Sequence, residues 1–187
     1  MDHEDRDRHL WWLALHGLRL GEIARLRWES VDFDAGTLAI VETRVAVGDE
    51  IRSGTPKSKA SKRVLPMDAA LADVLRAARA AQRAERLALG PDYAGGEYVA
   101  SGPSGNPYHP NLLTFRWGKL LDSLGITRVR LHDARHSSVS FQLARGIPLP
   151  TVAAWHGHQN PAVTAAIYAH SQPDALRDVA AIYRRAE

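Results

Sequence analysis

One stretch of this chain has the composition of β-strands, and it limits the folds that the rest can adopt. Residues 37–47 are rich in β-branched side chains and lie between turn signals at 34–36 and 48–49. Shorter strands are predicted at about 50–54 and 62–66, so that the three segments form a small three-stranded antiparallel sheet. The pattern therefore predicts an α+β fold that is mostly α-helical.

The other segments show the three- and four-residue spacing of apolar side chains that is typical of amphipathic helices. Asp68 is a predicted N-cap, and glycines and prolines begin or end most of the remaining helices. Residues 90–109 are predicted to form a loop with a brief extended piece at 98–100. The predicted helices span 3–16, 20–26, 68–89, 110–123, 131–145, 151–156, 161–169 and 173–185.

Length and composition indicate a single soluble domain. The chain has 187 residues, which is within the size of one domain, and it shows no internal repeat or low-complexity tract. Its apolar runs are all shorter than the ~20 residues that span a bilayer, and residues 1–9 contain no apolar signal-peptide core. We therefore expect a cytoplasmic protein without a membrane association.

The content of cysteine and lysine restricts the chemistry. The absence of cysteine excludes disulfides, thiolate nucleophiles and cysteine-ligated zinc, so any nucleophile is an oxygen or a nitrogen. Lysine is rare among the basic residues, yet Lys57, Lys59 and Lys62 lie within one predicted hairpin. A lysine can exchange a proton near neutral pH when its environment is perturbed, whereas an arginine cannot. A solvated, aggregation-resistant sheet edge is the alternative interpretation.

Five other residues could act together on a phosphodiester. Residues 131–170 contain the series His-x-x-Arg, Gly-His and Tyr, and an arginine lies between two glycines in Gly-Leu-Arg-Leu-Gly-Glu at 17–22. Two arginines could hold both non-bridging oxygens of the phosphate without a metal ion. A tyrosine could attack phosphorus once its hydroxyl, with an ordinary pKa near ~10, receives help in ionising. The five residues are Arg19, His132, Arg135, His158 and Tyr168.

Each of these residues also has an ordinary structural interpretation. Arg19 alone would be a solvated arginine at a helix end, and Tyr168 alone would be a packed residue of an amphipathic helix. A zinc site is a sharper alternative, because His132 and His136 are four residues apart and His156-Gly-His158 adds two imidazoles. The helix lacks the glutamate of a metalloprotease motif. We therefore expect no metal and no cofactor.

In order and spacing, these motifs resemble the catalytic domain of tyrosine recombinases, the phage integrase family, over nearly the whole chain. The resemblance implies the fold of that domain and a site-specific DNA recombinase or integrase that breaks and rejoins double-stranded DNA through a 3′-phosphotyrosyl intermediate. It implies that Tyr168 is the nucleophile and that His132 helps to ionise it. It also implies that His158 hydrogen-bonds the phosphate and that Lys57, or alternatively Lys59, protonates the departing 5′-oxygen.

The same resemblance gives expectations about domains and assembly. Residues 1–187 are expected to form the catalytic domain without the N-terminal DNA-binding domain of full-length members, and 173–187 to form a C-terminal tail helix. The expected assembly is a homotetramer on DNA and a monomer when free. A catalytically idle DNA-binding regulator or prophage relic is one alternative, and an enzyme like the type IB topoisomerases is another. The sequence departs from the family's Leu-Gly-His at His156.

Overall fold

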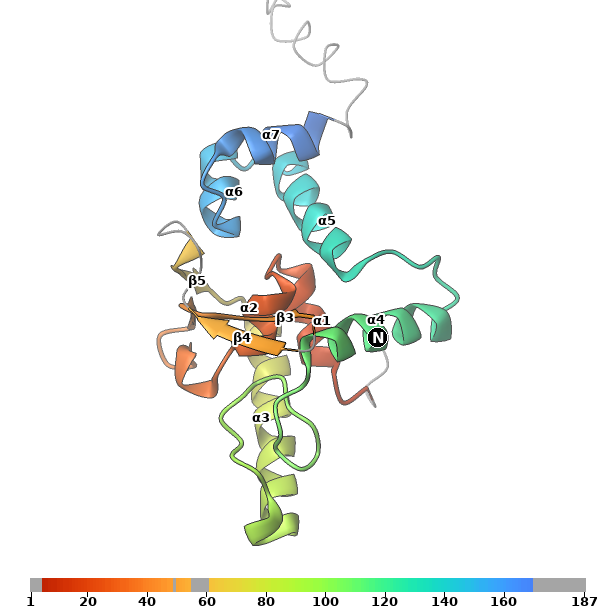
Figure 1. The fold of residues 1–187 in the computed structure, drawn as a ribbon. Coiled ribbons are helices and arrows are strands. Elements are labelled where there is room, and N and C mark those ends of the chain that lie inside the picture. The colour runs from red at the N-terminus through yellow and green to blue at the C-terminus, as the bar shows by residue number, and fades with distance from the viewer. Residues whose placement is uncertain (1–4, 49, 55–60, 170–187) are drawn as a thin grey trace, which may run out of the picture.

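The computed structural model of the protein describes residues 5–48, 50–54 and 61–169 (Figure 1). Its helices are α1 (Arg8–Leu15), α2 (Leu20–Arg25), α3 (Ala69–Leu89), α4 (Pro110–Ser123), α5 (Leu131–Ala144), α6 (Leu149–His156) and α7 (Pro161–Ala169). Its strands are β1 (Val31–Asp32), β2 (Thr37–Ile40), β3 (Thr43–Val47), β4 (Glu50–Gly54) and β5 (Arg63–Pro66). The short 3₁₀ helices are η1 (Trp28–Ser30) and η3 (Gly90–Asp92).

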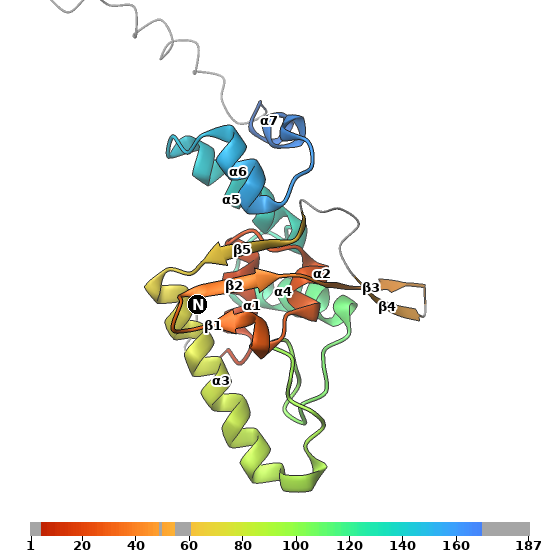
Figure 2. The ribbon, with the colours of Figure 1, turned by 90° about the vertical axis from the view of Figure 1, so that its left-hand side faces the viewer.

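The predicted small antiparallel sheet is present, but its strands differ from those expected. β2 is the central strand of the order β1-β2-β5, and Leu38 of β2 lies opposite both Val31 and Leu65. β3 and β4 form a separate two-stranded hairpin, which extends away from the three-stranded sheet (Figure 2). The single strand predicted at 37–47 is therefore two strands, and the predicted strand at 50–54 lies outside the main sheet.

The break between β2 and β3 follows from where their side chains are buried. Leu38 and Ile40 of β2 enter the core, whereas Val45 of β3 is 43% exposed. At the break, Glu42 accepts a hydrogen bond from Nε of Arg25 on α2 at 2.6 Å. Past Ile40, residues 41–47 are exposed or only partly buried, and β3 pairs with β4 instead of continuing along the main sheet.

α1 is the central helix of the hydrophobic core. It packs against α2, α3 and α5, and its side chains meet those of the sheet in one cluster of buried residues. Burying a large apolar side chain contributes about 1.5–3 kcal/mol, so this cluster supplies most of the driving force for folding. Its members include Leu10, Trp11, Leu13, Ile23, Leu38, Ile40, Leu71, Leu75 and Leu113.

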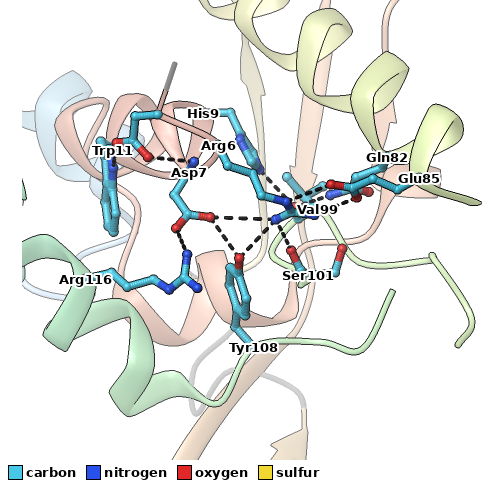
Figure 3. Close-up of polar contacts among 11 residues, drawn as sticks. Arg6, Asp7, His9, Trp11, Gln82, Glu85, Val99, Ser101, Tyr108 and Arg116 are labelled. Atoms are coloured by element: carbon cyan, nitrogen blue, oxygen red, sulfur yellow. Dashed lines mark hydrogen bonds and ion pairs between the residues drawn. The ribbon is translucent and has the colours of Figure 1, made fainter. Parts of the chain in front are cut away.

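A buried polar network joins the N-terminal end of α1 to the loop that precedes α4 (Figure 3). The carboxylate of Asp7 accepts a hydrogen bond from the Tyr108 hydroxyl at 3.1 Å and another from Arg116. Arg6 binds Glu85 of α3 at 2.7 Å and donates to the Tyr108 hydroxyl at 3.0 Å. Burial and the nearby charge of Asp7 raise the pKa of Tyr108 to about 12.

This network accounts for where α1 begins and for the contacts that hold the predicted loop. α1 begins at Arg8 rather than at residue 3, because Asp7 precedes it with a side chain that already binds the loop. The predicted loop at 90–109 is also held in place: the Val99 carbonyl accepts from Nε2 of Gln82 at 3.0 Å. The other described helices begin and end within about two residues of their predicted bounds. The predicted helix at 173–185 lies outside the described residues.

α5, α6 and α7 pack against one another at one end of the molecule, and α3 extends toward the opposite end (Figure 1). α5 also packs on α1, and Arg135 of α5 and His156 of α6 lie beside Gly17 in the turn that follows α1. Within the part of the chain that the structure describes, no helix combines the length and the apolar character needed to cross a membrane.

Candidate active site

Glu22 lies at the centre of the arrangement that positions Arg19. Arg19 is the N-cap of α2, and its backbone N–H donates to Oε2 of Glu22 at 2.8 Å. Nη1 of Arg19 donates to Oε1 of the same carboxylate, also at 2.8 Å. The Glu22 side chain is 0% exposed. This reciprocal contact at the first turn of a helix fixes both the backbone and the guanidinium of Arg19.

Arg63, the first residue of β5, forms a second pair with Glu22. Its Nη1 and Nη2 donate to Oε1 and Oε2 of Glu22 at 2.9 and 3.0 Å, and its Nε donates to the Trp155 carbonyl at 2.6 Å. The Arg63 side chain is only 7% exposed. Burial alone would raise the pKa of Glu22, but the hydrogen bonds and charges of Arg63 and Arg19 outweigh it and lower that pKa. The carboxylate is therefore ionised at neutral pH.

Arg135 reaches the same place from α5. Its guanidinium is buried and donates to the backbone carbonyls of Gly17 and His156. Burial and the positive charge of Arg19 lower the pKa of Arg135 to about 9, so the group keeps its charge at neutral pH. Both carbonyl acceptors flank other predicted site residues, since Gly17 precedes Arg19 by two positions and His156 precedes His158 by two.

His158 completes the group that the structure brings together. It follows the left-handed Gly157 that ends α6, and Nη2 of Arg19 donates to the Gly157 carbonyl at 3.0 Å. Nδ1 of His158 lies 2.8 Å from Oγ1 of the buried Thr164, at a distance where the direction of the hydrogen bond depends on the tautomer. Burial, Arg135 and Arg19 lower the pKa of His158 to about 4, so its ring is neutral at physiological pH.

A pocket of about 590 Å³ opens beside these residues. Its walls come from α2, the β3 strand, the residues before β5 and the turn between α6 and α7. Among the side chains and backbone that line it are Arg19, Thr43, Val45, Ser61, His158 and Val163. A pocket of about 630 Å³ between α1 and α3 is similar in size, but its lining contains none of the predicted site residues. The pocket beside Arg19 is therefore the candidate active site.

The structure places the remaining predicted residues as follows. His132 is exposed in the first turn of α5, and its ring packs edge-on against His136, with 4.7 Å between the ring centroids. Burial of part of the ring, followed by the charge of His136, lowers the pKa of His132. Tyr168 belongs to α7, but its side chain lies outside the described structure, as do Lys57 and Lys59.

Glu22, Arg63 and Thr164 are three contributors that the sequence analysis did not assign. Glu22 had a recognisable signal, because a glutamate three residues after an N-cap is typical of a capping box. Arg63 directly follows the lysine segment but has no pattern of its own that indicates burial. Thr164 lies six residues after His158, in the turn of α7 that faces it.

The zinc alternative lacks a set of ligands in the described structure. Within residues 5–48, 50–54 and 61–169, no group of three or more histidine, aspartate or glutamate side chains is arranged to hold a metal ion. His156, one of the four histidines considered, is completely buried against Gly17. Its ring stacks on that of His158 with 5.8 Å between the centroids.

Comparison with known proteins identifies the family of the chain. The model of the phage integrase family matches residues 3–174. A XerC-like tyrosine recombinase of Caldanaerobacter subterraneus subsp. tengcongensis is 32% identical over 169 residues, which cover 84% of this chain and 43% of that protein. The chain therefore spans less than half the length of this relative.

Two solved structures show the same fold at low sequence identity. The Tn1549 transposon integrase, solved in complex with transposon right end DNA, superposes with a TM-score of 0.78 at 16% identity, covering 98% of this chain and 60% of that one. The XerA recombinase superposes with a TM-score of 0.65 at 21% identity, covering 100% of this chain and 65% of that one. The family model matches residues 3–174, which is almost the whole chain. The chain therefore belongs to the phage integrase family, as its motifs predicted.

Proposed function

We propose that this chain is the catalytic domain of a site-specific recombinase that cleaves and rejoins double-stranded DNA through a 3′-phosphotyrosyl intermediate at Tyr168. The observation that carries the proposal is the meeting of Arg19, Arg135 and His158 beside one pocket. They come from the start of α2, from α5 and from the turn after α6, and a carboxylate holds Arg19, backbone carbonyls hold Arg135 and the Thr164 hydroxyl holds His158. The tyrosine recombinase and integrase names of the relatives support the same activity.

The two arginines suit a phosphate whose charge increases during the reaction. Attack at phosphorus places charge on the non-bridging oxygens, and guanidinium groups fixed beforehand stabilise that charge without reorganising. Arg19 is 32% exposed at the pocket and therefore has donors available to a substrate. Arg135 lies deeper and contributes mainly through its charge. These two groups supply the stabilisation that a metal ion would otherwise provide, so we propose a metal-independent reaction.

His158 is suited to donate a hydrogen bond rather than to exchange a proton. If Nδ1 accepts from the Thr164 hydroxyl, the single proton of the neutral ring is on Nε2, which can donate to a phosphate oxygen. The lowered pKa, about 4, keeps the ring neutral through the physiological range. The Thr164 hydroxyl can donate to Nδ1, so this contact is compatible with the tautomer that the proposed role requires.

The proposed reaction consists of two transfers at one phosphorus atom. The Tyr168 oxygen attacks phosphorus while neutral His132 accepts the phenolic proton, and the bond to the 5′-oxygen breaks. Lys57, or Lys59 in the alternative alignment, supplies the proton to that departing oxygen. Rejoining reverses these steps with a 5′-hydroxyl of the partner strand, so no water and no external energy are consumed. Ser61, two residues after Lys59, lines the pocket.

The assembly we propose follows the sequence expectation. The substrate is double-stranded DNA, the free domain is a monomer, and four copies assemble on two DNA duplexes. The tail at 173–187 is proposed to join neighbouring copies. Light scattering of the free protein and of its DNA complex would test both states.

The decisive experiment is covalent capture on a nicked DNA substrate that traps the cleaved product. The parent protein is expected to give an adduct that survives denaturing electrophoresis, and Tyr168→Phe is expected to bind the same DNA and give none. Tyr93→Phe is the matched control, because the buried Tyr93 hydroxyl has no hydrogen-bond partner within the described structure. An adduct in Tyr168→Phe at the parent's level would refute the assignment.

The lysine assignment needs a separate substrate. Replacing the leaving 5′-oxygen by sulfur removes the need for a proton donor, because a thiolate leaves unprotonated. Lys57→Ala is therefore expected to cut ordinary DNA poorly and the sulfur-containing DNA at the parent's rate. Rescue of Lys59→Ala, with no rescue of Lys57→Ala, would move the role to Lys59.

A further inference from the structure

Arg63 contacts three of the segments that make up the proposed site, although it is not among the residues proposed to touch DNA. Its guanidinium is bound to Glu22 of α2, to the Trp155 carbonyl of α6 and to the Ser61 carbonyl, the last through Nη1 at 3.0 Å. Its backbone lies opposite Ile40 in the sheet. One buried side chain thus connects the arginine motif, the histidine turn and the end of the lysine segment.

We propose that Arg63 is a positioning residue that holds Arg19 through Glu22 and holds the His158 turn through Trp155. The inference rests on the proposed function, since Arg19 and His158 are the groups proposed to contact the phosphate. Arg63 itself makes no contact with the substrate in this proposal. Its role is to keep the Glu22 carboxylate ionised and in one orientation.

The geometry of the shared carboxylate supports this role. Each oxygen of Glu22 accepts two hydrogen bonds, one from Arg19 and one from Arg63. The two parallel bonds from Arg63 fix the plane of the carboxylate, as a bidentate arginine does. That plane in turn sets where Nη1 of Arg19 can lie, and Nη2 of Arg19 then reaches the Gly157 carbonyl at 3.0 Å.

Charge gives a second reason for the pair. Glu22 has a completely buried side chain, and burial alone favours its protonated form. Without Arg63, Arg19 would remain as a single, partly exposed cation beside it. A protonated Glu22 would offer one acceptor fewer to Arg19, so the guanidinium of Arg19 would be released from its present position.

A simple stabilising role does not account for the arrangement. A buried ion pair generally adds little stability over well-packed apolar side chains of the same volume, because both charges lose their hydration. A lysine at position 63 could not make the same contacts either. Its ammonium is a point charge, whereas Glu22 and Trp155 together require two parallel donors and a third donor from another direction.

The test compares Arg63→Lys, Arg63→Met and the double variant Arg63→Met with Glu22→Gln. Arg6→Lys is the matched control, because Arg6 forms a similar pair with Glu85 in the network around Tyr108, and neither residue lines the candidate active site. Single-turnover cleavage of the nicked DNA, urea unfolding and the salt dependence of DNA binding are measured for each protein. Arg63→Lys is expected to cleave about 10²-fold more slowly than the parent, the size of effect expected when one preorganised donor is lost.

The double variant separates positioning from folding. It removes both buried charges, so its free energy of unfolding is expected to return toward that of the parent. Its cleavage is expected to remain about 10²-fold slower than that of the parent, because the ionised Glu22 carboxylate no longer holds Arg19. Recovery of cleavage together with stability would overturn the proposal and leave Arg63 a purely structural residue. Loss of cleavage in Arg6→Lys as large as in Arg63→Lys would do the same.

Salt dependence provides a readout that does not need catalysis. A displaced Arg19 contacts no phosphate, so the slope of log affinity against log salt is expected to become shallower by about 0.9 in Arg63→Lys and to stay unchanged in Arg6→Lys. An unchanged slope in Arg63→Lys would contradict the proposal. If the parent binds DNA and forms no adduct, the proposed function fails, and this slope still decides the role of Arg63.

Discussion

The buried imidazole of His156 is expected to make the stability of this domain depend on pH. His156 is 0% exposed, and although the backbone of Gly17 lies close to its ring, neither ring nitrogen has a hydrogen-bond partner in the described part of the chain. Burial and the positive charge of Arg135 lower its pKa to about 3. His156→Leu replaces the ring by an apolar side chain of similar volume that cannot bind a proton.

The sign and size of the effect follow from proton linkage. A histidine in the unfolded chain has a pKa near ~6.5, so between about pH 3 and pH 6.5 the unfolded chain binds a proton here that the folded domain does not. This contribution to stability is complete above about pH 6.5 and is lost as the pH falls through that window. At ~1.4 kcal/mol per pH unit, the loss between pH 7 and pH 5 is about 2 kcal/mol.

Urea unfolding of the parent and of His156→Leu at pH 7 and pH 5 measures this loss of unfolding free energy directly. The free energy of unfolding of His156→Leu relative to the parent is expected to increase by about 2 kcal/mol between the two pH values. Val139→Ala is the matched control, because it also changes a buried side chain but adds or removes no titrating group. A difference between His156→Leu and the parent that is the same at both pH values would refute the reasoning.

Two further substitutions test other parts of the structure by urea unfolding at pH 7. Gly17→Ala is expected to lower the free energy of unfolding by more than about 2 kcal/mol, because Gly17 has φ +92° and a Cβ there would lie 2.2 Å from Cε1 of His156. A loss within about 0.5 kcal/mol, the range of an ordinary surface change, would show that this contact is absent in solution. Asp7→Asn is expected to cost roughly 2–3 kcal/mol, because the charged hydrogen bonds to Arg116 and Tyr108 are weakened inside the protein. Asp34→Asn in an exposed turn is its control, and equal losses in the two variants would contradict the interpretation of Figure 3.

The helices were predictable because their signals are local. Asp68 accepts a hydrogen bond from the backbone N–H of Leu71 at 2.7 Å, as expected of the N-cap that its position indicated. Pro110 and Pro161 each occupy the first position of a helix, where a missing N–H has no cost. In these cases the residues that fix the boundary are neighbours in the sequence, and tertiary contacts only reinforce them.

The strands were harder to predict because their partners are distant in sequence. Residues 37–47 have the composition of one strand, and nothing within that stretch indicates that Ile40 is the last residue to enter the core. The pairing of β2 with β5 joins residues such as Ala39 and Val64, across the intervening hairpin and the lysine segment. The strands that pair are those whose side chains, such as Leu38 and Leu65, enter the common hydrophobic core, which composition alone does not describe.

The residues of the candidate site also divide into those that sequence motifs indicate and those that only the fold reveals. The order of the motifs indicated Arg19, Arg135 and His158, and the structure brings these three together. Arg63 was not predicted, because an arginine that pairs with a glutamate 41 positions earlier looks the same in sequence as one on the surface. Only the fold shows that its side chain is buried.

Burial and neighbouring arginines together set the pKa values of the buried groups in the site. Arg19, Arg63 and Arg135 bring three guanidinium groups to one region, where Arg19 and Arg63 both bind the carboxylate of Glu22 and Arg135 binds backbone carbonyls. Burial comes first in lowering the pKa values of Arg135, His156 and His158, and the positive charge of neighbouring arginines lowers each of them further. Both histidines are thus kept neutral first by burial and then by the positive charge of the neighbouring arginines. In the proposed function, a phosphodiester in the pocket supplies negative charge to this cluster, and its binding relieves the repulsion among the arginines. The arginines are already fixed by carbonyl and carboxylate contacts, so their attraction for the phosphate acts without reorganising the protein. Such a fixed attraction favours the more highly charged transition state over the bound substrate.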